Sequence, residues 1–312
     1  MRRVSCNIKM IVLSAGFVSA CLAADEPAHT EQPFDASTEL MNPIGRLSAI
    51  DNRFFYKSYQ GDLPNAGSQT TSGYVFEPVM PFELSNGRRL AVRFSLPMTF
   101  STPAYRYEDN EYADWLIRQR ADVLGTDGRW IEGHGHLDDI TYDIAYGDTE
   151  ENGLFWMVGL AGALPTSQDG SVERDQYVLG PEAAIGKTYD WGIFGAWGKH
   201  LVDVANSSRA EKQRPIDWKT SETRIRLIFG YNLGNDWQIV SNPEFVYDWE
   251  GVSDNKILLP LGGGVAKTFG IGRVPLRASL EAYYYGVSPD AFGPEWQLNF
   301  SLMPVISAWS LD

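Results

Sequence analysis

The stretch ETRIRLIFGYNLGNDWQIVSNPEFVYDW, residues 222–249, decides how the rest of the chain is interpreted. Over residues 223–233 apolar side chains alternate with mostly polar or small ones, which is the period of a β-strand with one apolar face. The alternation restarts after a short polar segment at residues 234–236 and continues to Trp249. The stretch therefore predicts a β-hairpin whose two strands share an apolar face.

The register of this hairpin follows from the rule that residues paired across two strands lie on the same side of the sheet. Leu233 and Trp237 are both on the apolar side, so we expect them to pair across a three-residue turn. The same register places Arg226 opposite Glu244 on the polar side.

The apolar face of the hairpin carries aromatic residues at both ends. Tyr231 and Trp237 lie at the turn, and Tyr247 and Trp249 lie at the far end. The steps from Trp237 to Trp249, at about 3.3 Å each and with a tilt of about 40°, span roughly 30 Å. This is about the apolar thickness of a bilayer, whose two interfaces are marked by aromatic girdles in membrane barrels. We therefore expect lipid on the apolar face and a polar lumen on the other.

A second hairpin has the same pattern at residues 74–84 and 90–100. Its turn, Ser85-Asn86-Gly87, predicts a left-handed Gly87 and places Glu83 opposite Arg89. Further strands are expected around residues 48–60, 140–146, 154–164, 177–185, 191–204, 257–265, 274–284 and 296–302. The connections between these strands alternate between short ones and ones that are mostly longer. This is typical of barrels with short periplasmic turns and longer extracellular loops. The predicted fold is all-β: a transmembrane antiparallel up-and-down β-barrel of about twelve strands.

The longest connection is expected over residues 102–136. Five residues there, most of them apolar, have helical spacing, which predicts a short amphipathic helix that folds against the rim or into the mouth of the barrel. The residues with this spacing are Tyr112, Trp115, Leu116, Gln119 and Val123.

The first residues have the pattern of an export signal. Arg2, Arg3 and Lys9 precede an apolar run that ends at Ala24, and acidic residues follow. We expect residues 1–24 to be a signal peptide, 25–43 a periplasmic lead-in that is disordered to about residue 39, and 44–312 the outer-membrane β-barrel. Both cysteines lie within the signal, and an alternative is lipid attachment at Cys21 after a lipoprotein-type cleavage.

The bulk composition excludes some classes of protein. The 312 residues have a formal net charge of −14, which argues against nucleic-acid binding. No later run of about 18 apolar residues exists, so a helical membrane span is not expected. The mean hydropathy of −0.25 does not argue against a barrel, because a barrel hides its lipid face in the alternation.

Several short motifs point to one family. They are Asn42-Pro43, Pro81-Phe82, Leu164-Pro165-Thr166, Leu179-Gly180-Pro181, Asp248-Trp249, Pro260-Leu261-Gly262-Gly263-Gly264, Tyr283-Tyr284 and Gly293-Pro294-Glu295-Trp296-Gln297-Leu298. Together they resemble landmarks of the outer-membrane family filed under the meta pathway of phenol degradation, from about Asn42 to Pro304. The resemblance implies a membrane barrel with a transporter role and an association with aromatic compounds.

Charged and tyrosine side chains on the predicted inner face are the candidates to line the lumen. They are Glu77, Arg89, Arg93, Asp143, Glu182, Arg224, Arg226, Glu244, Asp248, Arg277, Glu281, Tyr283 and Tyr285. They could orient a polar or aromatic solute in a pore, or pair with one another and fill a sealed lumen. For Tyr283 and Tyr285 two interpretations stay open, stacking on an aromatic solute or joining a hydrogen-bond network.

The leading hypothesis is a monomeric outer-membrane channel, not an enzyme, for passive passage of small, aromatic or hydrophobic molecules. The partners expected are outer-membrane lipid, the barrel-assembly machinery and an unidentified small solute, with no nucleic acid and no cofactor. One alternative is a lipid-modifying enzyme with His134, His136 or His200 as its base, although no G-x-S-x-G motif supports it. The spacing of His134 and His136 would also allow both to bind a metal, but it fixes no third ligand. The last alternative is a sealed structural barrel whose outer loops bind partners.

Overall fold

The computed structural model describes residues 36–106, 128–133, 135–167, 176–207, 219–251, 255–272, 274–306 and 309–310. The barrel belongs to the unit Asp35–Asp312, and Met1–Phe34 form a separate unit. Expectations for the signal peptide, for Cys21 and for His134 lie outside the described residues. Within the described part, no helix is long and apolar enough to cross a bilayer.

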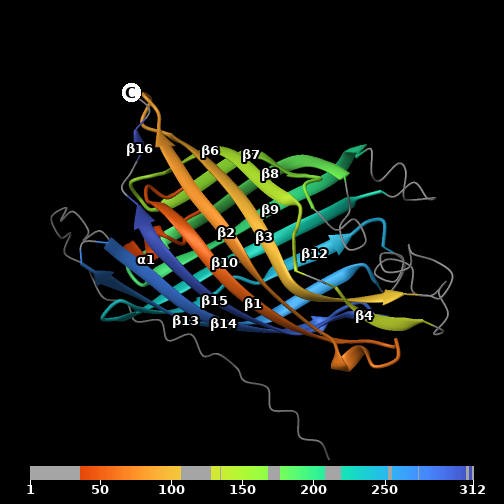
Figure 1. Cartoon of the computed structure of the whole chain (residues 1–312). Coiled ribbons are helices and arrows are strands. Elements are labelled where there is room, and N and C mark those ends of the chain that lie inside the picture. The colour runs from red at the N-terminus through yellow and green to blue at the C-terminus, as the bar shows by residue number, and fades with distance from the viewer. Residues whose placement is uncertain are drawn as a thin grey trace, which may run out of the picture. The chain divides into compact units, whose positions relative to one another are not determined.

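Long antiparallel strands form one closed barrel (Figure 1). Neighbouring strands along the chain are hydrogen-bonded and the last pairs with the first, except that β11 and β12 do not pair with each other and instead both pair with β10 and β13. They are β1 (Ser48–Gln60), β2 (Thr70–Glu83), β3 (Arg89–Arg106), β6 (Ile140–Thr149), β7 (Leu154–Leu164), β8 (Gln176–Tyr189), β9 (Gly192–Asn206), β10 (Ser221–Gly234), β11 (Trp237–Ser241), β12 (Glu244–Asp248), β13 (Ile257–Ile271), β14 (Val274–Val287) and β15 (Gly293–Ile306). With β11 and β12 counted as one interrupted strand, the described residues form a twelve-stranded barrel, which confirms the predicted fold class.

Within the described residues, five shorter elements accompany the barrel strands. They are α1 (Ala36–Glu39), η1 (Ala66–Ser68), β4 (Arg129–Gly133), β5 (His136–Leu137) and β16 (Trp309–Ser310). The strand β16 pairs in parallel with the end of β2, and β5 pairs with β3.

The structure corrects the expectation that the long connection begins at Thr102. Residues 102–106 still belong to β3 and pair with β4, so the hairpin continues further than the alternation alone suggests. Tyr105 is buried and its ring meets Trp130 edge-on at 4.9 Å, and this aromatic contact stabilises the extended hairpin. The residues of the predicted amphipathic helix lie outside the described part of the chain.

The alternation of each strand separates an outer apolar face from an inner face. Large apolar side chains on the outer face are exposed, for example Leu160 at 53% and Leu280 at 57%, whereas inward-pointing Gln238 is exposed at 1%. An exposed apolar surface that encircles a protein is unfavourable in water and suits contact with lipid. The barrel wall therefore has the predicted arrangement, with its apolar face outward and its other face toward the lumen.

Aromatic rings of the outer face gather toward both ends of the strands. Near the short turns, Tyr189 stacks on Trp191 with ring centroids 4.9 Å apart, and Trp191 lies 6.0 Å from Tyr231. Toward the longer loops, Tyr247 and Trp249 lie 4.7 Å apart. The central hairpin thus has an aromatic group at each end, as the sequence predicts.

The register of the central hairpin is confirmed at Arg226 and Glu244, but the predicted turn is wrong. Gly234, not Leu233, pairs with Trp237, and a bulge precedes Gly234. The turn has two residues, Asn235 and Asp236, with φ angles of 50° and 61°. Two left-handed residues match the twist of a hairpin, and the residue left over is absorbed in the bulge, so Leu233 still faces outward.

The turn of the earlier hairpin agrees with its prediction. Gly87 has φ 79° and Glu83 pairs with Arg89. The backbone N–H of Leu84 donates to the carbonyl of Arg88 at 2.8 Å, and the N–H of Gly87 donates to the carbonyl of Leu84 at 2.8 Å, so three residues connect the strands.

A segment before the first strand lies inside the barrel, near the short turns (Figure 1). We call residues 36–47 the N-terminal plug. The backbone carbonyl of Pro43 accepts hydrogen bonds from Arg93 at 2.8 and 3.1 Å, and Asn42 donates to Thr149 at 2.9 Å. Ser37 and Thr268 share a hydrogen bond of 2.6 Å. The disorder expected for residues 25–39 therefore does not extend to Ala36–Glu39, which form a helical turn.

The N-terminal plug also supplies an apolar core to this end of the lumen. Ile44 is fully buried, and Met41 packs against the same cluster. The inward-pointing residues around them are Ala91, Ala145, Phe155, Met157, Ala184, Ile193 and Ile228. The expectation of a polar lumen is thus wrong for this end, where a buried apolar layer replaces it.

Candidate functional site

The barrel encloses a cavity beyond the N-terminal plug. Its inner part, of about 550 Å³, has residues 40–43 of the plug among its lining. Its outer part, of about 620 Å³, reaches Tyr59 and Phe292 near the longer loops. Both parts are lined by Arg53, Glu77, Arg93, Trp197, Arg226, Glu244 and Tyr285, so they form one continuous lumen.

The structure brings most of the lumen candidates together at this cavity. Those that line it are Glu77, Arg93, Asp143, Arg224, Arg226, Glu244, Asp248, Arg277, Glu281, Tyr283 and Tyr285. Arg89 and Glu182 do not line it. Arg89 is buried near the short turns and forms an ion pair with Asp148 at 3.2 Å, and Glu182 lies against the edge of Trp197.

A network of paired charges lies on the neighbouring strands β10 and β12. Glu244 accepts from Arg226 at 2.9 Å and from Arg224 at 3.2 Å, and Arg224 also meets Glu222 at 2.7 Å. Strand alternation places Glu222, Arg224 and Arg226 on one face, and the Arg226–Glu244 register brings the second strand beside them. Glu244 is thus neutralised by two guanidinium groups.

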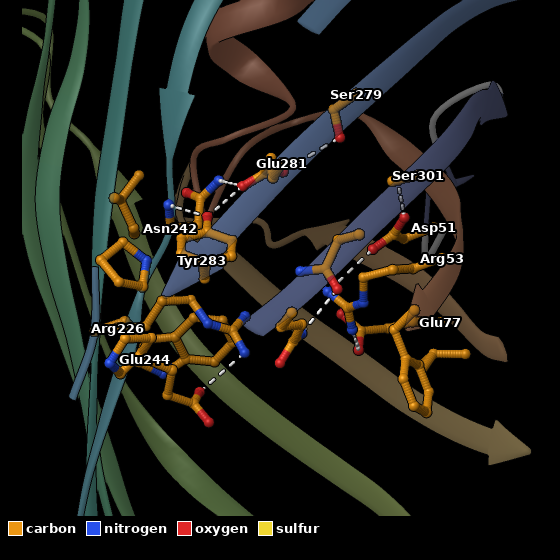
Figure 2. Close-up of a pocket in the computed structure, with 18 of the residues that line it drawn as sticks. Asp51, Arg53, Glu77, Arg226, Asn242, Glu244, Ser279, Glu281, Tyr283 and Ser301 are labelled. Atoms are coloured by element: carbon orange, nitrogen blue, oxygen red, sulfur yellow. Dashed lines mark hydrogen bonds and ion pairs between the residues drawn. The ribbon is translucent and has the colours of Figure 1, made fainter. Parts of the chain in front are cut away.

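The opposite wall carries a second group of paired charges. Arg53 lies 3.5 Å from Asp51 and 3.9 Å from Glu77, and the Ser301 hydroxyl donates to Asp51. Figure 2 shows this group across the pocket from Arg226 and Glu244. Arg93 adds a third pair, with Asp143 at 3.3 Å, just beyond the N-terminal plug.

Tyr283 forms part of a hydrogen-bond network at the interruption between β11 and β12 (Figure 2). Its hydroxyl donates to Glu281 and accepts from the backbone N–H of Asn242 at 2.9 Å. The next residue, Pro243, has no N–H and interrupts the hydrogen bonds between the strands. The Tyr283 hydroxyl therefore accepts from the Asn242 N–H, which has no partner in the neighbouring strand. This geometry favours the hydrogen-bond role for Tyr283, whereas Tyr285 donates to Gln297 at 2.7 Å and also lines both parts of the cavity.

Sequence reasoning missed three important lumen residues, Arg53, Trp197 and Lys199. Trp197 lines both parts of the cavity, and Lys199 lines its outer part. The faces of β9 could not be assigned from sequence because Ile193, Trp197 and Leu201 point inward while Phe194 and Val204 are exposed outward. Lys199 itself was the available signal, since a lysine in the middle of a membrane strand belongs on the lumen side.

An aromatic cluster forms the outer end of the cavity. Tyr59 stacks on Phe292 with centroids 4.4 Å apart, and Trp130 lies 4.7 Å from Phe292. The indole N–H of Trp130 donates to the carbonyl of Pro64 at 2.6 Å, which fixes the ring on the loop before β2. Among the described residues, the lining is thus aromatic at the outer end of the cavity and charged further in.

The two described histidines, His136 and His200, contact different residues. His136 pairs with Asp138 at 2.8 Å, and Asp138 also accepts from Thr99 at 2.8 Å. His200 shares a hydrogen bond of 3.0 Å with the hydroxyl of Thr223, which also accepts from the Trp249 indole at 2.9 Å. Among the described residues, no group of three or more potential ligands is arranged to hold a metal ion.

Comparison with a solved structure supports the fold. No family model matches the chain, and no curated protein matches it. The crystal structure of an outer membrane channel from Pseudomonas putida F1 is similar over 89% of this chain and 100% of its own, with 12% sequence identity and a TM-score of 0.53. The β domain of the Bordetella autotransporter BrkA matches over 83% of this chain and 100% of its own, with 14% identity and a TM-score of 0.40. The fold is that of an outer-membrane β-barrel.

Proposed function

We propose that the chain is an outer-membrane channel for passive passage of small molecules that are aromatic or hydrophobic. The observation that carries the proposal is the continuous lumen, which runs from the aromatic cluster to the N-terminal plug. Each part of it falls in the range of about 300–1,000 Å³ that is usual for small-molecule sites. The motifs that resemble the phenol-degradation family, and the channel that shares the fold, make transport the first activity to test.

The charged lining supports passage of a solute rather than a chemical step. Its carboxylates and guanidinium groups are mostly paired with each other, as in the Arg226–Glu244 pair at 2.9 Å. Paired charges keep water and polar groups in a lumen without fixing one ion tightly. We propose a monomer in outer-membrane lipid, exported by its signal peptide and inserted by the barrel-assembly machinery, with neither an enzymatic activity nor a nucleic-acid partner.

A sealed structural barrel is the second candidate, and the N-terminal plug favours it. Ile44 is fully buried in the apolar layer, so the solute path ends there unless the plug moves. In this case the longer loops would carry the function by binding partners.

Swelling of liposomes that contain the refolded chain separates the two candidates. A channel should admit small uncharged solutes, at rates that fall as the solute approaches the width of the lumen. Liposomes without protein and liposomes with the heat-unfolded chain are the controls. If a correctly folded barrel admits no solute of any size, the sealed barrel replaces the channel.

A further inference from the structure

Strand β9 places a lysine on the lumen wall beside a tryptophan. Lys199 and Trp197 are two residues apart, so they share the inner face, and both line the outer part of the cavity. In the register of the sheet Lys199 lies between Glu182 of β8 and Arg224 of β10. An acidic neighbour directly across a strand would ordinarily pair with the lysine.

Both register neighbours of Lys199 bind other groups. Glu182 accepts a hydrogen bond of 3.0 Å from the indole N–H of Trp197 through Oε2, and its buried Oε1 has no hydrogen-bond partner within the described residues. Glu182 does not line the cavity. Arg224 is held by Glu222 and Glu244. Lys199 forms no ion pair within 4 Å with any residue that the structure describes, and its ammonium group lies over the Trp197 ring, with Nζ 5.7 Å from the centroid.

The surroundings of Lys199 are rich in further cations. Arg93 lies 4.5 Å and Arg226 lies 5.3 Å from the same indole centroid, so three cations gather around one ring. Each arginine has its own carboxylate, Asp143 or Glu244. Within the described part of the chain, the ammonium group of Lys199 is the cation of this cluster that no carboxylate contacts, and an anion in the enclosed cavity would lower its electrostatic free energy.

We infer that Lys199, flanked by Trp197 and Arg226, is an anion-binding subsite of the lumen, and that the ligand is the carboxylate of a small aromatic acid. The inference rests on the proposed function, because it names the class of solute. One ammonium group that no carboxylate contacts within the described residues matches a single negative charge, while the nearby carboxylates Asp143 and Glu244 oppose a multiply charged anion. The aromatic ring is expected because the rings of Tyr59 and Phe292 lie at the outer end of the same cavity.

Fluorine NMR of 4-fluorobenzoate with the refolded full-length chain in detergent tests the subsite. We expect the fluorobenzoate signal to broaden with the wild-type chain, and the affinity to fall at least about tenfold in Lys199→Gln because a charge-assisted contact is lost. Lys199→Arg should keep the affinity within a few-fold. Lys187→Gln is the matched control: it makes the same charge change beside Tyr189 on the outer face, and should leave the affinity unchanged. Neutral 4-fluorobenzamide should bind more weakly than fluorobenzoate to the wild-type chain.

The outcomes distinguish the subsite from the channel. Equal broadening by wild type and Lys199→Gln, or no broadening by wild type, overturns the subsite whether or not the barrel admits solutes. Loss of binding in Lys199→Gln alone supports the subsite, even if swelling shows a sealed barrel. Heat-modifiable migration in gels checks that each variant is folded, and if Lys199→Gln does not fold, equal affinities for the acid and the amide overturn the inference.

Discussion

At the scale of single residues, neighbours along a strand have opposite surroundings. Arg226 points into the lumen and shares Glu244 with Arg224, whereas Leu227 belongs to the outer apolar face. A charged side chain therefore has a different effect on stability at position 226 than at position 227. In the lumen it contacts water and side chains of opposite charge, whereas on the outer face it would contact lipid.

Leu227→Arg should prevent stable insertion, while Arg226→Ala should not. A charged residue near the bilayer midplane costs about 2–4 kcal/mol on the lipid face of a barrel. Arg226→Ala leaves Glu244 with its other partner, Arg224, at 3.2 Å. The measurement is the folded fraction in lipid vesicles, from heat-modifiable migration in gels. Equal tolerance of both substitutions would mean that the two faces of β10 have been assigned the wrong way round.

Backbone conformation makes a second residue-scale prediction at two glycines near the short turns. Gly234 has φ 86°, and a Cβ there would meet no atom within 4 Å. Gly270 is equally open but has no left-handed φ, so it serves as the matched control. Gly234→Ala should lower the free energy of unfolding by about 1–2 kcal/mol, and Gly270→Ala should change it less. Urea unfolding in vesicles measures both, and equal effects would remove backbone strain as the cause.

At the scale of elements, the N-terminal plug fills the end of the lumen near the short turns. It is held by hydrogen bonds such as Asn42 to Thr149 and by the buried side chain of Ile44. Gly230 of β10 makes room for it, since a Cβ there would lie 2.6 Å from the sulfur of Met41. The surfaces of the plug and of β10 are thus complementary at Met41 and Gly230.

Ile44→Ala should loosen the plug and raise the conductance of the barrel. Removing a buried isoleucine side chain costs about 2–5 kcal/mol of packing. Ile50→Ala, on β1 between inward-pointing Ala49 and Asp51, removes the same atoms from the outer face and should leave the conductance unchanged. Conductance recordings of the two variants, together with limited proteolysis of the plug, measure the effect. An unchanged conductance in Ile44→Ala would show that the plug does not limit passage.

The elements differ in how well the sequence predicts them. The strand faces and the Arg226–Glu244 register could be predicted from the alternation of apolar and polar residues. A shift of the register by one residue would move every side chain of the strand to the opposite face of the sheet. The geometry of the turn at Gly234 could not be predicted from the alternation. A three-residue loop and a two-residue turn with a bulge both keep Leu233 and Trp237 on the outer face. The N-terminal plug left only a weak signal, apolar Ile228 and Val240 on an inner face expected to be polar. The faces of β9 were ambiguous, so Trp197 and Lys199 could not be placed at the site.

At the scale of the whole molecule, the closed barrel combines an apolar exterior with a lumen divided in two. The end near the short turns is filled by the N-terminal plug and its apolar layer. The rest is a charged cavity that ends at an aromatic cluster. In the proposed channel, passage along the lumen therefore depends on the N-terminal plug.

Single-channel conductance of the refolded mature chain in a planar bilayer tests the proposed channel most directly. We predict discrete conductance steps that benzoate reduces and benzyl alcohol reduces less, with higher or longer openings in Ile44→Ala. A barrel that migrates as folded yet conducts neither as wild type nor as Ile44→Ala would contradict the channel and leave the longer loops as the functional part of the molecule.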